Sequence, residues 1–135
     1  MSKNKSLLAG ADTPVATEVE RYLNNARRIL KENAGKKDGE YADIKYVQMA
    51  AGTAYVGVLM AIDAYLQQKE GTKYSKPKSI EEYRTRVAKQ NKKLLALLNE
   101  AYGDLHLSAY YHGNPSVRIM NNGFSTAEEI LAYIR

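Results

Sequence analysis

The feature that most constrains this chain is a long apolar segment near its middle, from Tyr46 to Leu66, which reads YVQMAAGTAYVGVLMAIDAYL. Wound as a helix, this segment is apolar on almost every side. Such a helix is enclosed by other helices and does not lie on a surface. The segment therefore predicts the central helix of a bundle, beginning near residues 41–43 and ending at about Lys69.

Small side chains recur within this central helix at steps of four, three and four residues, at Ala50, Ala54, Gly57 and Ala61. They form a stripe along which another helix can approach closely. Glycine inside a helix costs about 1 kcal/mol relative to alanine, and close packing would offset that cost. The pattern favours helix packing, with a ligand groove along the stripe as the alternative.

The first helix is expected to begin at Thr13, whose hydroxyl can cap it while Pro14 occupies the first turn. A capping box formed by Thr17 and Glu20 one turn later is the alternative start. Apolar residues then recur every three or four positions, which predicts an amphipathic helix ending near residues 33–35. The polar residues before it, 1–12, are expected to form a mobile leader.

Two further capping boxes mark later helices, Ser79 with Glu82 and Ser125 with Glu128. The first opens a long third helix, and the second opens a short final one. The apolar stripe of the third helix is Ile80, Tyr83, Val87, Asn91, Leu94, Leu98, Ala101 and Leu105. Residues 35–39, GKKDG, predict a turn, and no strand pattern is seen. The expected fold is an all-α, four-to-five-helix up-and-down bundle formed by one domain, residues 13–135.

The chain contains no cysteine, which excludes disulfides, thiolate catalysis and cysteine-ligated zinc. Its first ten residues hold only a two-leucine apolar patch, and no apolar run is expected to approach the length of a membrane span. These features predict a cytoplasmic protein that contacts no membrane. No glycine-rich phosphate loop is found in the sequence, and no cofactor is expected.

The net charge of +5 is concentrated in residues 69–93, which hold nine basic residues and three acids, a net +6. A local excess like this can attract RNA, a nucleotide or an acidic protein. The residues predicted to bind such a partner are Lys73, Tyr74, Lys76, Lys78, Arg86, Lys89 and Lys93. The alternative is a solvated helix face and loop without a partner.

Two polar side chains fall at apolar positions and are predicted to be buried, Asp63 in the central helix and Asn91 in the third. A carboxylate in such surroundings must reach the edge of the bundle or find a donor. A structural hydrogen bond to a Tyr, Lys or Arg side chain is the favoured interpretation. The alternatives are a general acid or base, and a small-molecule site in the bundle interior lined by both residues and tyrosine hydroxyls.

The two histidines, His106 and His112, lie about 120° apart around a helix, so they do not share a face that could bind a metal. No metal is expected. Neither histidine has the Glu three residues earlier that di-iron bundles require. If the chain is an enzyme, its catalytic candidates are these histidines with Arg118 and Asp104, brought together by the fold.

Several segments together resemble the HEPN superfamily of helical domains and related small uncharacterised bacterial helical proteins. They are the first helix EVERYLNNARRIL, the alanine- and tyrosine-rich central helix, the long third helix and the closing FSTAEEILAYI. The resemblance implies a helical bundle, frequent dimerisation, and RNA, nucleotide or protein partners. HEPN ribonucleases carry an Arg and a catalytic His separated by four to six residues, and neither His106 nor His112 follows an Arg at that spacing. The resemblance therefore implies a non-catalytic member.

The sequence as a whole favours a non-enzymatic binding or assembly module that forms a homodimer and contacts an acidic partner through residues 69–93. Two alternatives belong to other classes of protein. One is a HEPN-like RNA-cleaving enzyme with a rearranged site, and the other is the interior small-molecule binder.

Overall fold

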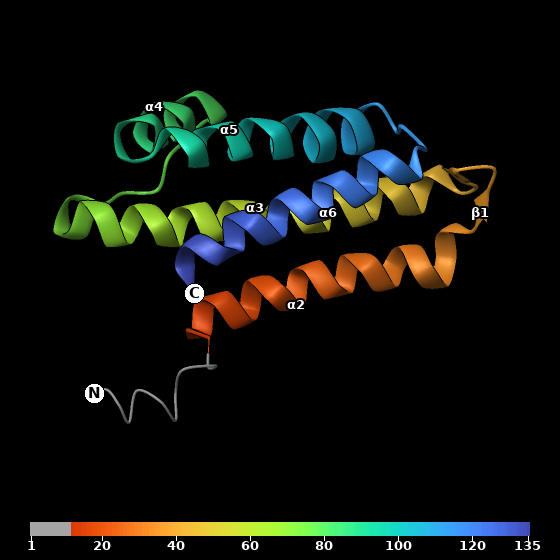
Figure 1. The fold of residues 1–135 in the computed structure, drawn as a ribbon, viewed down its shortest axis with the longest axis horizontal. Helices are drawn as coiled ribbons and strands as arrows, with labels where there is room; N and C mark the ends of the chain where they lie inside the picture. Colours follow the sequence, from red (N-terminus) through yellow and green to blue (C-terminus); the bar gives the residue numbers. More distant parts are fainter. Residues whose placement is uncertain (1–11) are drawn as a thin grey trace.

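The computed structural model describes residues 12–135 of the chain. The leader expected at residues 1–12 therefore lies outside the described residues, apart from Asp12. Within the described part, five α-helices enclose one apolar core, and a two-stranded hairpin sits at one end (Figure 1). The predicted all-α bundle is confirmed.

Helix α2, Pro14–Ile29, begins at the first of its two predicted starts. The Thr13 hydroxyl accepts a hydrogen bond from the Ala16 N–H at 3.1 Å. Wider π-helical turns, η1 (Leu30–Ala34), extend the helix to its predicted end. Its apolar side packs on the central helix and is buried at Ala16, Val19, Leu23 and Ala26.

Helix α3, Ile44–Glu70, is the central helix that the apolar segment predicts. Its stripe of small residues is buried and covered by α2. A Cβ on Gly57 would lie 3.3 Å from Cβ of Tyr22 and 3.6 Å from Leu23, so the two helices approach closely there. The stripe therefore serves helix packing, and α2 occupies the position of the alternative ligand groove.

The stretch Ile44–Lys73 is long and apolar enough to cross a membrane, with an 18-residue window of mean hydropathy 1.4. The expectation that no apolar run approaches a membrane span is therefore wrong. Within the bundle, 56% of that window is buried. Enclosure by other helices accounts for the same apolar composition.

The predicted long third helix is divided at Asn91 into α4, Ile80–Gln90, and α5, Lys92–Ala101. The backbone of Asn91 is extended, and its side chain accepts a hydrogen bond from the Leu94 N–H at 2.9 Å. The prediction that Asn91 is a buried polar residue is wrong, because Asn91 is a partly exposed cap that starts a new helix. A π-helix, η3 (Tyr102–Tyr111), continues α5.

The final helix begins earlier than predicted. Helix α6, Val117–Leu131, follows Ser116, whose hydroxyl accepts a hydrogen bond from the Ile119 N–H at 3.2 Å. The predicted start at Ser125 is wrong, since Ser125 lies inside this helix. After α6 the chain returns to the beginning of α2, where Arg135 pairs with Asp12 at 3.0 Å and with Glu20 at 2.9 Å.

A small hairpin joins α2 to α3. Strand β1, Lys36–Lys37, pairs antiparallel with β2, Glu40–Tyr41. Asp38 and Gly39 have φ values of 55° and 81°, which suit the tight Asp-Gly turn of a hairpin. The predicted turn is confirmed, while the expectation of no strand is wrong for the four paired residues. The Tyr41 N–H donates to the carbonyl of Pro115 at 2.8 Å, which ties the hairpin to the start of α6.

Candidate functional site

The exposed large hydrophobic residues within residues 12–135 all lie on α3 and η3. They are Met49, Val56, Leu107, Tyr110 and Tyr111. Single exposed hydrophobic residues are common on soluble proteins, but a cluster of them indicates an interaction surface. Three of these side chains, those of Met49, Val56 and Tyr110, line a shallow hollow together with Gly52 and His106. We call these five residues the aromatic face.

A stack of rings fixes one side of this face. The His106 ring lies 5.1 Å from Tyr102 and 5.7 Å from Tyr110, centroid to centroid, with interplanar angles of 23° and 21°. Tyr55 of α3 lies 5.0 Å from the same His106 ring. The π-helical turns of η3 bring these side chains, four residues apart, onto one side. Such turns are rare and are frequent at functional sites.

Two contacts hold Tyr110 against the central helix. A Cβ on Gly52 would lie 3.3 Å from Cδ1 of Tyr110, so the absence of a side chain lets the ring lie on α3. The Gln48 side chain donates a hydrogen bond to the Tyr110 carbonyl at 3.1 Å. The face is therefore built before any partner arrives. This face is not among the sites predicted from the sequence, although the four-residue spacing of Tyr102, His106 and Tyr110 is visible there.

Asp63 reaches the edge of the bundle, where its side chain is 15% exposed. Its Oδ1 accepts hydrogen bonds from the hydroxyls of Tyr83 at 2.8 Å and Tyr74 at 3.2 Å, and Lys76 Nζ lies 3.8 Å from Oδ2. Burial, together with the hydrogen bond to Asp63, raises the pKa of Tyr83. These contacts match the favoured structural interpretation of Asp63, although its side chain, like that of Asn91, is partly exposed and not buried as predicted. The interior site lined by both Asp63 and Asn91 does not form, because Asn91 caps α5.

Arg86 is directed inward, unlike the free cation that the sequence predicts. Its guanidinium donates to Glu70 at 3.0 Å, to Glu82 at 2.8 Å and to the carbonyl of Ser75 at 2.6 Å. The hydrogen bond with Glu70 is the main cause that raises the pKa of Arg86. The same guanidinium lies 5.4 Å from the centroid of the Tyr74 ring. Arg86 and Tyr74 therefore fix the loop after α3, and their predicted role in binding a partner stays a prediction.

The other predicted binding residues are exposed lysines on the loop after α3 and on α4 and α5. They are Lys73, Lys76, Lys78, Lys89 and Lys93. In Figure 1 the end of α3 and helix α4 lie together at the end of the bundle opposite the hairpin. Apart from Lys76 with Asp63, none of these lysines has an acid within 4.0 Å in the described part of the chain. We call the cluster of lysines that lack an acidic partner the basic end; it comprises Lys69, Lys73, Lys78, Lys89, Lys92 and Lys93.

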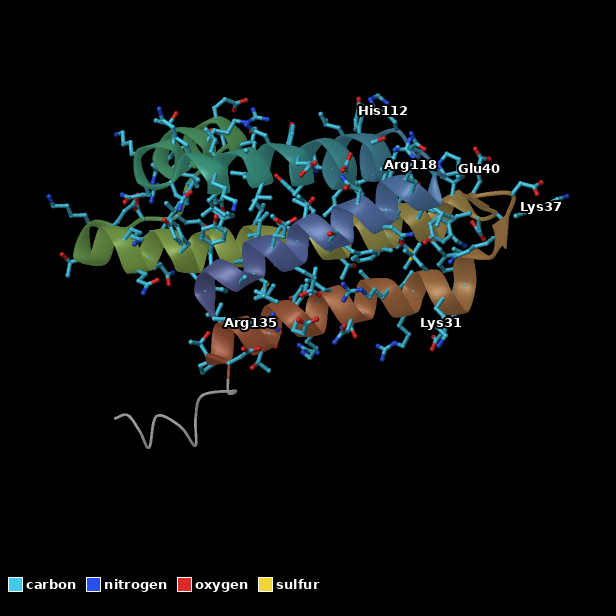
Figure 2. All side chains as sticks on the ribbon, in the orientation of Figure 1. Lys31, Lys37, Glu40, His112, Arg118 and Arg135 are labelled. Carbon is cyan, nitrogen blue, oxygen red and sulfur yellow. The ribbon has the colours of Figure 1, made fainter. Side chains whose placement is uncertain are left out.

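The four catalytic candidates do not form one linked cluster. His106 belongs to the ring stack, and Asp104 accepts a hydrogen bond from the Asn122 side chain. His112 and Arg118 lie at the hairpin end of the bundle (Figure 2). Between residues 12 and 135, no hydrogen bond or ion pair links any two of the four, and no group of three metal-ligating side chains is found.

The known proteins that resemble this chain identify its family, but no activity is described for them. No curated protein matches the chain. The solved structure of a protein of unknown function from Dyadobacter fermentans is 39% identical, with a TM-score of 0.78, and the match covers 89% of this chain and 92% of that one. The family model described as a domain of unknown function, DUF5618, matches residues 15–135. The chain therefore belongs to the DUF5618 family.

Proposed function

We propose that this protein is a non-enzymatic assembly module that forms a homodimer through the aromatic face. The observation that carries the proposal is that three of the five exposed large hydrophobic side chains of residues 12–135, Met49, Val56 and Tyr110, border one hollow. Covering contiguous apolar surface of this kind is favourable in water. The HEPN resemblance supports the proposal through the dimerisation that it implies.

The chemistry of the face favours a second copy over an acidic partner. None of the residues that line the hollow is Asp, Glu, Lys or Arg, although the chain carries a net charge of +5. Two copies can therefore meet there without burying an unpaired charge, which costs several kcal/mol per ion. An acidic partner would find no cation to pair with on this face.

The shape of the face suits a two-fold contact. The hollow, of about 490 Å³, lies beside Gly52, while Met49 and Tyr110 stand next to it and are 50% and 46% exposed. A surface that carries both a ridge and a hollow can be complementary to itself across a two-fold axis. Because the ring stack and the Gln48 contact already fix Tyr110, little ordering is required on association.

The test is the mass of the protein in solution across a wide range of concentration, measured by sedimentation equilibrium. Val56 is 46% exposed and lines the hollow of the face, so Val56→Lys places a charge there with little cost to the monomer fold. The matched control, Thr17→Lys, adds the same charge at an exposed position on α2. We expect a dimer for the natural sequence and for Thr17→Lys, and a monomer for Val56→Lys.

A natural chain that stays at the monomer mass of 15.1 kDa at every concentration would refute the homodimer. A dimer that persists in Val56→Lys would refute the assignment of the interface to the aromatic face. Circular dichroism of Val56→Lys checks that its helix content and thermal transition match those of the control.

The basic end supports a second candidate function, binding of an acidic macromolecule by the same module. Its six lysines lack acidic partners within 4.0 Å in the described part of the chain, so their charges are free to face solvent. Lys69 and Lys73 also border a hollow of about 530 Å³. Clustered, unpaired ammonium groups attract polyanions by releasing bound counterions.

Fluorescence anisotropy with a labelled single-stranded RNA tests this second candidate, with a labelled polyglutamate in parallel. Changing Lys69, Lys73 and Lys89 to Gln should weaken binding and reduce its dependence on salt. The control changes Arg28, Lys37 and Lys45 to Gln, which removes the same charge at exposed positions outside the basic end. Equal losses in the two triple variants would indicate an effect of net charge alone and would reject the basic end as a site.

A further inference from the structure

A cavity of about 570 Å³ lies between α2 and α6 at the hairpin end of the bundle. The two helices are close where the Thr13 hydroxyl meets the carbonyl of Ile134 at 3.4 Å. They separate toward the hairpin, as Figure 1 shows, and the cavity fills the space that this divergence opens. None of the residues predicted from the sequence to bind a ligand lies in it.

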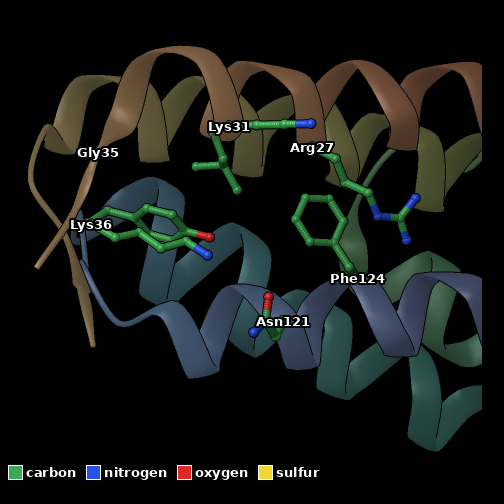
Figure 3. A pocket seen from close by; sticks show the side chains of 8 residues that line it. Arg27, Lys31, Gly35, Lys36, Asn121 and Phe124 are labelled. Carbon is green, nitrogen blue, oxygen red and sulfur yellow. The ribbon is translucent and has the colours of Figure 1, made fainter. Parts of the chain in front are cut away.

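The floor of the cavity is apolar. Leu30, Tyr41 and Phe124 line it, and each is buried in the fold. Figure 3 shows the Phe124 ring within the cavity, with Asn121 on the wall formed by α6. A concave site with aromatic lining and few polar groups favours a flat, apolar body.

Cations surround this floor on the side of α2 and the hairpin, as Figure 3 shows for Arg27, Lys31 and Lys36. Arg27 is already paired, because its guanidinium lies 2.9 Å from Glu128 and covers the Phe124 ring at 4.9 Å. Lys31 and Lys36 have no acid within 4.0 Å among residues 12–135. Two ammonium groups from different elements therefore border the apolar floor without a counterion from this part of the chain.

The walls of the cavity are fixed by backbone hydrogen bonds. The Tyr41 N–H donates a hydrogen bond to the Pro115 carbonyl at 2.8 Å, and the Val117 N–H donates one to the Gly39 carbonyl at 3.1 Å. These two bonds join the hairpin to the start of α6. Gly35 has φ of 64° and ψ of 156°, a conformation that favours glycine, and it adds no side chain to the cavity. A ligand would thus meet a site that is already formed, which reduces the cost of binding.

We propose that this cavity binds a small molecule that carries a flat aromatic ring and one anionic group. The ring packs against the edges of Phe124 and Tyr41, because Arg27 and Lys36 lie over these two rings at 4.9 Å and 5.9 Å. The anion pairs with the ammonium groups of Lys31 and Lys36. The apolar floor disfavours a bare inorganic anion, and the unpaired lysines disfavour a neutral ring. Aromatic carboxylates and nucleoside monophosphates share this chemistry, and the experiment distinguishes them.

Isothermal titration calorimetry with indole-3-acetate, adenosine monophosphate and neutral indole tests the proposal on the natural chain. The double variant Lys31→Gln with Lys36→Gln removes both ammonium groups at exposed positions. The matched control, Lys37→Gln with Lys45→Gln, removes the same charge; Figure 2 shows Lys37 pointing away from the bundle. We expect at least one of the two anions to bind, about tenfold more weakly to the first variant and unchanged to the control.

The anion that binds more tightly identifies the group, carboxylate or phosphate, for which the site is built. In two-dimensional NMR spectra its addition should shift the resonances of Phe124 and Asn121. The proposal is overturned if neither anion binds, if neutral indole binds as tightly as the anions, or if the two double variants lose affinity equally. The Val56→Lys variant should bind the anion unchanged, which separates this site from the aromatic face.

Discussion

At the scale of single residues, tyrosine supplies nearly all the aromatic surface of this chain, with eleven Tyr against one Phe and no Trp. Each buried Tyr brings a hydroxyl into the fold, and that hydroxyl can ionise. Burial raises the pKa of Tyr55 to about 12, and burial with the Asp63 hydrogen bond raises that of Tyr83. The fold therefore prefers the protonated form of both side chains.

This preference predicts a loss of stability in alkali. The contribution of both hydroxyls is complete below about pH 10, the pKa of an unfolded tyrosine, and is lost as the pH rises toward the folded values. Urea unfolding at several pH values above about 10 should show a falling midpoint. In the Tyr55→Phe variant the urea midpoint should fall less with rising pH, because the ionisable hydroxyl of Tyr55 has been removed. An equal fall in the variant would show that Tyr55 does not carry the effect.

The fates of Asp63 and Asn91 show what residue patterns can and cannot predict. Both are polar residues at apolar helical positions, and the pattern alone assigns them the same buried role. Asp63 did find Tyr and Lys partners, as predicted. Asn91 instead interrupts the helix, because an Asn side chain can accept a backbone hydrogen bond and cap a new one. The three- and four-residue spacing of apolar residues continues from α4 into α5, so this spacing gives no sign that the helix is interrupted at Asn91.

At the scale of elements, the contact between η3 and α6 depends on a glycine. Gly123 is buried within α6, and a Cβ there would come within 2.5 Å of Cδ2 and 2.9 Å of Cγ of Leu105. Leu105 is itself fully buried in the core. The two elements therefore pack at a distance that only glycine at this position permits.

We predict that Gly123→Ala destabilises the fold by about 1–3 kcal/mol through overpacking. Gly103 is the natural control, since nothing lies within 4 Å of the Cβ that would be added in η3. Gly103→Ala should be neutral or stabilising by up to about 1 kcal/mol, because alanine favours helical backbone. Chemical denaturation of both variants measures the difference, and similar values for the two would contradict the close contact.

Helix existence was easier to predict than helix boundaries. The all-round apolar composition of α3 identifies a central helix, and Thr13 and Ser79 cap helices where expected. The start of α6 was placed one segment too late, because Ser125 with Glu128 also has the spacing of a capping box. Only the fold shows that Ser116 performs that role. The aromatic face escaped prediction for a related reason, since Met49 and Val56 look like core residues in a helix that is apolar all round.

At the scale of the whole molecule, the position of α3 predicts a gradient of local stability. Its residues from Ala50 to Leu66 pack at the centre of the bundle, whereas the hairpin, Lys36–Tyr41, has only four paired residues. Hydrogen exchange should therefore be slowest in α3, where amides open only on global unfolding. The backbone amides of the hairpin should exchange faster, because local opening of the hairpin exposes them without global unfolding. Exchange in α3 as fast as in the hairpin would contradict the central placement of this helix.

Two expectations about the whole molecule, its membership of the HEPN superfamily and the alternative of RNA cleavage, stay predictions. Neither the family description nor the D. fermentans protein is identified with the HEPN superfamily. The RNA-cleaving alternative still depends on His106 and His112, which have separate surroundings in the fold. Nuclease activity that is unchanged after replacing both histidines with Ala would remove that alternative.

The ion pairs of Arg135 with Asp12 and Glu20 have a consequence for how the chain could be rearranged. Because these pairs place the two ends of the described chain side by side, a short peptide could join them into a ring. Opening that ring at the Asp38–Gly39 turn would give a circular permutant with the same packed helices. Such a molecule would begin at Gly39, and α2 would be its last α-helix, followed by strand β1.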